Sequence, residues 1–517
     1  MSSPRKLTRI NGRVFSSSNQ ALEIAPGLAP LVSRSTRLMR RVDQLFEEVT
    51  FTVTTRTVSR QRLQAFRGAR TGPSLEGLLA REDERGRTTE RLRSLGFEIL
   101  HEGLFGVVVR GPAVLTRDVL MVELILQARQ RQSAIRSTQA FGAFHGAPRV
   151  EELFVAPRQS LSISADFSDD ADDVIFEPPP LYFQPVSATP AACSYRTIDE
   201  AAIRHYLGVP DCHTGAGAVI GMIDTGFFPH PYFAANNYDL ARSVTSESPR
   251  PEIDEVGHGT AMAANAFAVA PGCKVLGFKH NIDLPSHVPL ERAFRAGVDI
   301  VTCSWGFENE QVFSVVEATI RKLVREGRIV LFAAGNGVQA WPASMPEVLA
   351  VGGVHADEND AFEASNFASG FNSSAYPGRV VPDICGLCGQ KPLGVYLMLP
   401  CAPGSVLDRS QAVAKEASNP LSQFPETDET EAADGWAGAS GTSAATAQLA
   451  GAAAILVAAA KAAGKKLDTA RLKKILTETA VPVTKGRNAF GSPASATVPN
   501  IATGFGLANV GAALKKI

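Results

Sequence analysis

Three apolar runs in the central part of the chain, each ending beside a glycine turn, constrain its fold more than any other feature. They are Ala218–Ile223, Asp299–Gly306 and Gly327–Asn336. Near-continuous apolar runs are typical of strands covered on both faces, as in a parallel sheet. Helical patterns lie between them, so the sequence predicts an α/β domain with a doubly wound, mostly parallel sheet flanked by helices. In such sheets, functional residues gather at the carboxyl ends of the strands.

Four polar side chains stand in glycine turns near these runs. Asp224 lies in Asp-Thr-Gly, His258 in Gly-His-Gly-Thr, Asn336 in Gly-Asn-Gly and Ser443 in Ser-Gly-Thr-Ser-Ala-Ala. A serine hydroxyl is a weak nucleophile until a histidine takes its proton, and the histidine needs a carboxylate to hold its tautomer. Each residue alone is more often a cap or turn residue than a catalyst. The ordered set inside matching flanks favours the catalytic interpretation.

The order Asp, His, Ser and the flanking sequences resemble the subtilisin-like serine proteases, the subtilase or peptidase S8 family, and within it a bacterial-type intracellular member. The resemblance runs from near Tyr195 to the C-terminus. It implies that Ser443 attacks the scissile carbonyl, that His258 acts as base and then as acid, and that Asp224 orients His258. It also implies that Asn336 donates its amide to the oxyanion, beside the backbone N–H of Ser443.

The resemblance extends to two segments expected to bind the substrate. One is similar to the strand edge on which these proteases lay a peptide as an added β-strand, and the other to the opposite wall of the first specificity pocket. The first consists of Ser304, Trp305 and Gly306, and the second of Ala333, Ala334 and Gly335.

The chain departs from the family pattern at two positions beside the reactive residues. Ala261 stands where relatives have a second histidine after His258, and Ala447 where they have a proline after Ser443. Proline in the first turn of a helix is common but not required. The short run from His258 to Val275 also lacks the asparagine-rich insertion with which many relatives bind calcium, an ion that needs about six to eight oxygen ligands. We therefore expect no metal and no cofactor.

The stretch between Asn336 and Ser443 is longer than in compact members of the family, and the excess falls at about residues 390–436. Turns at Pro400–Gly404 and an acidic run at Glu426–Glu431 mark this insertion. A solvated surface loop is the commoner case, and a substrate rim that selects basic or extended peptides is the alternative.

A second domain precedes the catalytic one, since 517 residues suffice for two or three domains. Residues 45–160 show the order strand, helix, hairpin, helix, strand of a ferredoxin-like α+β unit. Subtilases often carry a prodomain of this order, which implies a segment that assists slow parallel-sheet folding and blocks the cleft. The alternative is an unrelated accessory domain. The expected elements are Glu47–Thr54, Ser74–Leu95, Phe97–Leu100, Phe105–Arg110, Arg117–Ala128 and Val150–Val155.

Charge is divided unevenly along the chain. The first 150 residues hold 24 Lys and Arg against 13 Asp and Glu, a net charge of +11, whereas the whole chain has −1. Neither an aromatic-interleaved basic patch nor a zinc spacing supports nucleic-acid binding. Electrostatic docking of the two parts is the simpler explanation. The expected partners are therefore a polypeptide substrate and the chain's own prodomain, with no nucleic acid.

Residues 161–194 are expected to form an acidic, proline-rich linker. Five aspartates between Asp166 and Asp173 precede Pro178–Pro180. Like charges repel and proline runs stiffen a chain, and exposed linkers are sites of proteolysis. We expect any self-cleavage within Ser162–Pro190. The predicted architecture is thus a basic extension (1–44), a prodomain (45–160), this linker, and a catalytic domain (195–517).

The cysteines and the apolar segments indicate the cellular compartment of the protein. Seven cysteines, several in expected core strands, argue against a disulfide framework and suit a reducing compartment. Cys385 and Cys388 form a CxxC pair with only Cys401 near, whereas zinc needs four ligands. The N-terminus lacks a signal-peptide core, and the alanine-rich Ala444–Ala463 is expected to be a buried central helix, not a membrane span. A cytoplasmic protein without membrane contact is expected, and export by a non-standard route is the alternative.

Three functions stay open at this point. The first is a serine endopeptidase made as a self-inhibited zymogen. The second is a catalytically silent relative whose cleft binds a peptide. The third is a regulatory protease that cuts one partner only. Fluorophosphonate labelling separates the first from the second, and activity on casein separates the first from the third.

Overall fold

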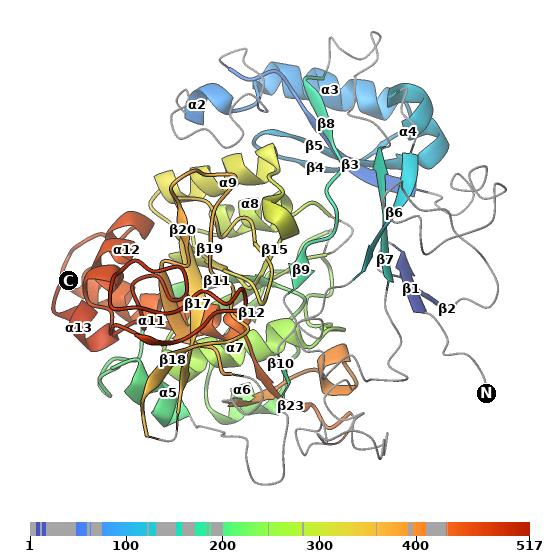
Figure 1. Ribbon diagram of the computed structural model, residues 1–517. Coiled ribbons are helices and arrows are strands. Elements are labelled where there is room, and N and C mark those ends of the chain that lie inside the picture. The colour runs from blue at the N-terminus through green and yellow to red at the C-terminus, as the bar shows by residue number, and fades with distance from the viewer. Residues whose placement is uncertain are drawn as a thin grey trace.

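A mostly parallel sheet fills the centre of the larger domain in the computed structural model (Figure 1). Its strands pair in parallel except for β17 with β18. In sheet order they are β12 (Asp239–Arg242), β13 (Lys274–Lys279), β11 (Val219–Asp224), β14 (Ile300–Cys303), β16 (Ile329–Ala333), β17 (Leu349–Ala356), β18 (Phe362–Ala364) and β24 (Lys485–Gly486), and β21 (Ile384–Leu387) also pairs with β17.

The structure describes only part of the chain, and every statement below concerns that part. It comprises residues 7–10, 13–16, 48–58, 63, 75–120, 124–130, 151–157, 171–182, 186–187, 200–246, 248–281, 284–357, 359–390, 397–409, 431 and 433–517.

Helices cover both faces of the large sheet. Side chains of β14 alternate: Ile300 packs in the core with α7 and α11, and Val301 in the core with α8 and α9. The predicted doubly wound sheet is therefore confirmed. The helices of this domain include α5 (Glu200–Tyr206), α6 (Pro231–Ala235), α7 (His258–Val269), α8 (His287–Arg295), α9 (Ser314–Arg325), α11 (Thr442–Ala462), α12 (Thr469–Glu478) and α13 (Val510–Leu514).

Helix α11 is long and apolar enough to cross a membrane by composition, but 89% of its most apolar window is buried inside the protein. It packs against α7 and the strands β14, β16, β17 and β21. It has the position expected for a core helix of the sheet. The small residues of α11 allow this close approach. At Gly451, for example, an added Cβ would lie 2.6 Å from the carbonyl oxygen of Ala266.

Short strands surround the carboxyl edge of the large sheet. Strand β15 pairs with β9, and β23 lies between β10 and β22. These strands are β9 (Leu181–Tyr182), β10 (Val186–Ser187), β15 (Trp305–Gly306), β22 (Leu397–Pro400) and β23 (Trp436–Ser440), and a separate hairpin is formed by β19 (Phe371–Asn372) and β20 (Val380–Val381).

The N-terminal domain contains an antiparallel sheet in the order β4-β5-β3-β8, which is the strand order of a ferredoxin-like unit. Its core includes Phe51, Val53 and Val109 of the sheet and Leu92 of the covering helix. The elements are β3 (Glu48–Thr54), α2 (Leu75–Leu78), α3 (Glu82–Ser94), β4 (Glu98–Glu102), β5 (Gly106–Pro112), α4 (Ala113–Leu120) and β8 (Asp173–Ile175).

Two predictions for this domain were wrong. The helix expected over Arg117–Ala128 ends at Leu120, and β6 (Leu124–Gln130) follows it. The strand expected at Val150–Val155 exists as β7 (Glu151–Pro157), but it joins β6 in another sheet with β1 (Leu7–Ile10) and β2 (Arg13–Ser16). The latter two lie in the predicted basic extension.

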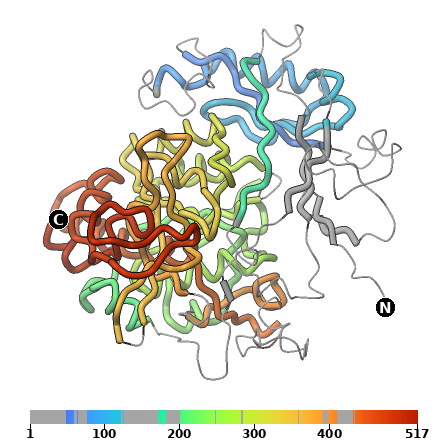
Figure 2. The backbone as a smooth tube through the Cα atoms, viewed as in Figure 1, coloured from blue at the N-terminus to red at the C-terminus, as the bar shows by residue number. Residues whose placement is uncertain are grey.

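The segment predicted as an exposed linker supplies the missing strand of the ferredoxin-like sheet. Strand β8 pairs with β3, and Val174 is 3% exposed in the domain core. The acidic residues beside it are typical of an exposed linker, so the sequence did not indicate a strand of only three residues. The linker prediction was therefore wrong for this part of the segment, and Figure 2 shows the chain continuing from β8 along the catalytic domain. Residues 161–170, 183–185 and 188–194 of the segment lie outside the described residues.

Candidate active site

The four candidate residues lie at or just beyond element ends on one edge of the large sheet. Asp224 is the last residue of β11, and His258 is the first residue of α7. Asn336 follows β16, and Ser443 is the second residue of α11. Because the carboxyl ends of parallel strands share one edge, residues distant in the sequence lie along that edge.

Asp224 and His258 form a buried pair. His258 Nδ1 lies 2.7 Å from Asp224 Oδ1, and the two side chains are 2% and 0% exposed. The backbone N–H of Thr225 also donates to Asp224 Oδ1, at 2.8 Å. A carboxylate in this position holds the imidazole with its proton on Nδ1, which leaves Nε2 to act as the base.

Ser443 is fixed at the start of α11 by contacts with the neighbouring strand. Its hydroxyl donates to the carbonyl oxygen of Ser304 at 3.2 Å, and the Ser304 hydroxyl donates to the carbonyl oxygen of Ser443 at 3.1 Å. Gly441, just before the helix, has φ 155°, a value that favours glycine. The first N–H groups of a helix have no intrahelical acceptor, so this end of α11 favours negative charge.

Asn336 is held with a defined amide orientation. Its Oδ1 accepts from the backbone N–H of Thr442 at 3.0 Å and from the Thr442 hydroxyl at 2.9 Å. The oxygen is thereby engaged next to Ser443, and the NH₂ group is the donor that remains on this side chain. The pair of contacts fixes which side of the amide serves as donor.

The candidate substrate-binding segments also border this edge. Ser304 is 3% exposed beside Ser443, and β15 begins with the next residue. The ring of Trp305 is fully buried and donates to the carbonyl oxygen of Ile223 at 3.0 Å, so only the backbone of Trp305 and Gly306 is suited to pairing with a peptide. Ala333 ends β16, Ala334 and Gly335 follow it, and both alanines are fully buried.

Asp254 is a functional candidate that we did not identify from the sequence. One of its carboxylate oxygens accepts from the Thr225 hydroxyl at 2.7 Å and the Gly257 N–H at 2.9 Å. The other accepts from the N–H and hydroxyl of Thr260, at 2.9 and 2.6 Å. Burial raises the pKa of Asp254, and these donors act in the opposite direction. The carboxylate thus joins the residue after Asp224 to the turn that carries His258. The signal in the sequence that could have identified Asp254 was its position four residues before the histidine.

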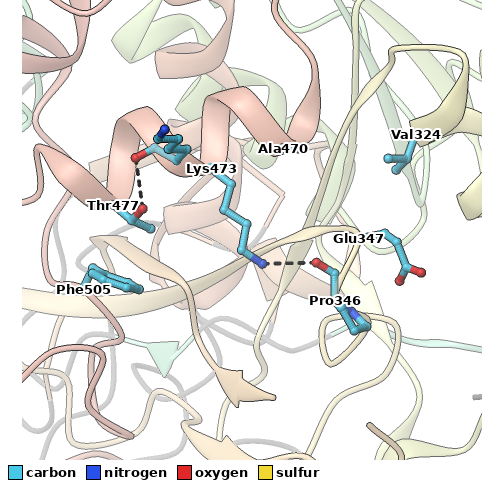
Figure 3. Close-up of a pocket in the computed structure, with 8 residues that line it drawn as sticks. Val324, Pro346, Glu347, Ala470, Lys473, Thr477 and Phe505 are labelled. Carbon is cyan, nitrogen blue, oxygen red and sulfur yellow. Dashed lines mark hydrogen bonds between the residues drawn. The ribbon is translucent and has the colours of Figure 1, made fainter. Parts of the chain in front are cut away.

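A cavity of about 520 Å³ lies away from these residues, between α9, α12 and the loop before β17 (Figure 3). Lys473 donates to the carbonyl oxygen of Pro346 at 3.3 Å and pairs with Asp383 at 2.8 Å. This lysine is therefore already paired within the protein. The lining residues are Val324, Pro346, Glu347, Ala470, Lys473, Lys474, Thr477 and Phe505.

The cysteines and the other metal-binding side chains that the structure describes do not gather into a metal site. Within the described residues, no cluster of three or more His, Cys, Asp or Glu side chains could hold a metal ion. Cys385 and Cys388 are free thiols with no exposed surface, and burial holds the pKa of each well above its ordinary value. They have the features of structural cysteines.

The chain is similar to known proteins in sequence and in fold. The Peptidase_S8 subtilase family matches residues 215–506. Fervidolysin from Fervidobacterium pennivorans, described as a keratinolytic enzyme related to subtilisin, has a structure aligned with 100% of this chain and 64% of its own at 14% identity and a TM-score of 0.52. At that identity the likeness shows the fold alone.

Another solved structure, that of the prenylagaramide maturation protease PagA, is aligned with 61% of this chain and 97% of its own at 20% identity and a TM-score of 0.40. No curated protein matches the sequence.

Proposed function

The chain belongs to the subtilase family of serine peptidases, and from that premise we propose that it is an endopeptidase acting through Asp224, His258 and Ser443. The observation that carries the proposal is the buried Asp224–His258 pair at 2.7 Å, on the sheet edge where Ser443 stands in the first turn of α11. A pair in this geometry stabilises the imidazolium that forms when the serine loses its proton. A protein that only bound peptides would gain nothing from this arrangement.

In the proposed reaction, Ser443 Oγ attacks the scissile carbonyl while His258 Nε2 takes its proton. The oxyanion receives hydrogen bonds from the Asn336 amide and the Ser443 N–H, which lies at the positive end of α11. His258 then protonates the leaving amine, and an acyl-enzyme forms on Ser443. Water attacks this ester with His258 again as base, so that the carboxyl product leaves and the serine is restored.

Fluorophosphonate labelling tests the assignment of the nucleophile. We expect the wild type to become labelled and Ser443→Ala to remain unlabelled, with His258→Ala slowed by several orders of magnitude. Thr446→Ala is the matched control, since it removes a hydroxyl one turn further along α11 that donates to the Thr442 carbonyl at 2.7 Å. Wild type that resists labelling after removal of the N-terminal domain would favour the silent peptide-binding alternative.

We propose further that the N-terminal domain inhibits the enzyme in the same chain. Strand β9 pairs antiparallel with β15, with Leu181 opposite Gly306, which is how an extended substrate would pair. Strand β10 pairs with β23, the strand that leads into Ser443. The chain's own segment thus has a partner strand on each side of the nucleophile.

Contacts between the domains support this inhibitory role. Glu291 on α8 has no exposed side-chain surface, and its carboxylate lies 3.1 Å from His101 Nε2 and accepts from the N–H of Leu104 at 3.0 Å. Burial disfavours the charge on Glu291, but the hydrogen bond to His101 and the neighbouring imidazoles hold its pKa below the ordinary value. Phe105 packs beside this contact, in one cluster with Val315 of α9. In Figure 1, α8 and α9 lie directly beneath this domain.

N-terminal sequencing of the purified protein tests the zymogen proposal. We expect self-cleavage within Ser162–Pro190. Because β9 pairs with β15, which follows Ser304, and β10 pairs with β23, which leads into Ser443, the cut should fall between Tyr182 and Val186. The three residues between these positions lie outside the described residues. Processing that persists unchanged in Ser443→Ala would exclude self-cleavage.

A further inference from the structure

The insertion before the nucleophile contacts both halves of the active site. Its described part, Leu397–Arg409, is called the support segment below. Strand β22 at its start pairs with β23, with Leu397 opposite Ala439 and Pro400 opposite Trp436. Leu397 and Leu399 are buried at 8% and 1% exposure, whereas Met398 is exposed at 37%. This part of the insertion is therefore an ordered strand attached to the one that leads into Ser443.

The other end of the support segment contacts the turn before His258. The N–H of Val406 donates to the carbonyl oxygen of Glu255, and the N–H of Leu407 to that of Val256, both at 2.9 Å. Gly257 follows at once, with φ 85°, and a Cβ built on it would lie 2.4 Å from Ser405 Oγ. The support segment thus closes one side of the turn in which His258 stands.

Asp408 links the support segment to the residue before β23. It is fully buried, and its Oδ2 accepts from the N–H of Gly404 at 2.6 Å and from that of Gly435 at 3.4 Å. Gly435 lies just before β23, and Gly404 lies in the turn before Ser405. One carboxylate oxygen therefore ties the segment that contacts the His258 turn to the strand that leads into Ser443.

We propose that the support segment positions His258 relative to Ser443, with Asp408 as its central positioning residue. The inference rests on the proposed function, because it gives this segment a role in that reaction. Proton transfer from serine to histidine depends steeply on distance and alignment, and a displacement of about 1 Å can cost roughly a hundredfold in rate. Two successive backbone hydrogen bonds and a buried carboxylate restrict such a displacement.

Rate constants for fluorophosphonate labelling and peptide hydrolysis, normalised by active-site titration, test the proposal. We expect Asp408→Ala to lower kcat by about tenfold to a hundredfold, to change KM by less than about threefold, and to shift the acidic limb of the pH profile. Asp408→Asn should recover most of kcat, because a single amide oxygen in the place of Oδ2 can accept both N–H groups. Asp434→Asn is the matched control on the exposed part of the same loop.

Val406→Pro gives a second test that leaves Asp408 intact. Val406 begins a short helical turn, where proline fits, so the substitution removes the N–H that donates to Glu255 with little other change. We expect kcat about threefold to tenfold below that of Val406→Ala, which keeps the donor.

The proposal is overturned if Asp408→Ala matches Asp434→Asn in kcat and pH profile, or if only KM changes. It is also overturned if Val406→Pro matches Val406→Ala. Failure of the proposed function looks different, because the wild type itself would then resist labelling. In that case amide hydrogen exchange still tests whether the support segment holds the His258 turn. Exchange at Val406 and at Gly257–Thr260 should be faster in Asp408→Ala than in Asp434→Asn.

Discussion

Replacement of Asp254 by asparagine should separate the scaffold of the active site from its chemistry. Each Asp254 oxygen receives one backbone N–H and one threonine hydroxyl. An asparagine keeps one acceptor oxygen and presents an NH₂ group to the other pair. The hydroxyl of that pair can rotate to accept, but the backbone N–H cannot. One buried N–H is thus left without an acceptor, which costs about 1–3 kcal/mol.

Asp254→Ala leaves both backbone donors without their acceptor, so we expect roughly twice that loss, about 2–6 kcal/mol. The free energy of unfolding, measured by urea denaturation in the Ser443→Ala background to prevent autolysis, checks both values. Asp239→Asn is the control: its carboxylate is 61% exposed and lies 3.9 Å from Lys274, and such surface pairs contribute at most about 1 kcal/mol.

The same substitution should slow catalysis, because Gly257 and Thr260 flank His258. With Ser443 intact, we expect fluorophosphonate labelling of Asp254→Asn to be about tenfold to a hundredfold slower than that of wild type. A midpoint of unfolding and a labelling rate both equal to those of Asp239→Asn would refute the reasoning. A lower midpoint with an unchanged rate would make Asp254 a residue of the fold alone.

Three further predictions concern the oxyanion site and the domain contact. Asn336→Ala should lower kcat by roughly 10²–10³ with little change in KM, as measured by steady-state hydrolysis after activation. Burial raises the pKa of Glu177, which accepts from the N–H of Ser286 at 2.7 Å, from 4.5 to about 7. The docked form therefore holds its proton more tightly, and the contact should be fully present below about pH 4.5 and lost as the pH rises through about 7. The protection factor of the Ser286 amide, which corrects for the base-catalysed rise of exchange with pH, should fall over this range in Ser443→Ala but not when Glu177→Gln is added. Glu291→Ala removes one partner of a buried pair and should weaken the affinity of the cleaved N-terminal domain for the catalytic domain by roughly 10²–10³, which is seen as loss of co-elution. Glu102→Ala, which alters an exposed carboxylate on β4, should leave co-elution unchanged.

The sequence was sufficient to predict the large sheet because its strands are marked by local pattern. Ala218–Ile223 is apolar throughout since both its faces are covered, and Asp224 follows it directly. The fourth strand of the N-terminal sheet has no comparable signal. Strand β8 has three residues beside an acidic run, and what identifies it is the contact of Val174 with a core whose other buried members, apart from Ala171, lie fifty or more residues earlier.

Asp254 and the support segment were missed for another reason. Their roles depend on hydrogen bonds between residues distant in sequence, such as the Val406 N–H with the carbonyl oxygen of Glu255. A backbone N–H carries no mark of its acceptor in the sequence. Local signals place Asp408 in the predicted insertion, and only the fold shows that this segment reaches the His258 turn.

The place of β8 in the chain bears on how the proposed zymogen would be activated. A cut between Tyr182 and Val186 leaves β4, β5, β3 and β8 together upstream, so the N-terminal sheet loses no strand. The Glu291 contacts and the β9–β15 pairing also involve only residues upstream of the cut and the catalytic domain. The cleaved N-terminal fragment therefore keeps its fold and its contacts with the cleft. Cleavage and activation are then separate events, and activity should appear only when the fragment dissociates or is degraded, with a delay that Glu291→Ala shortens.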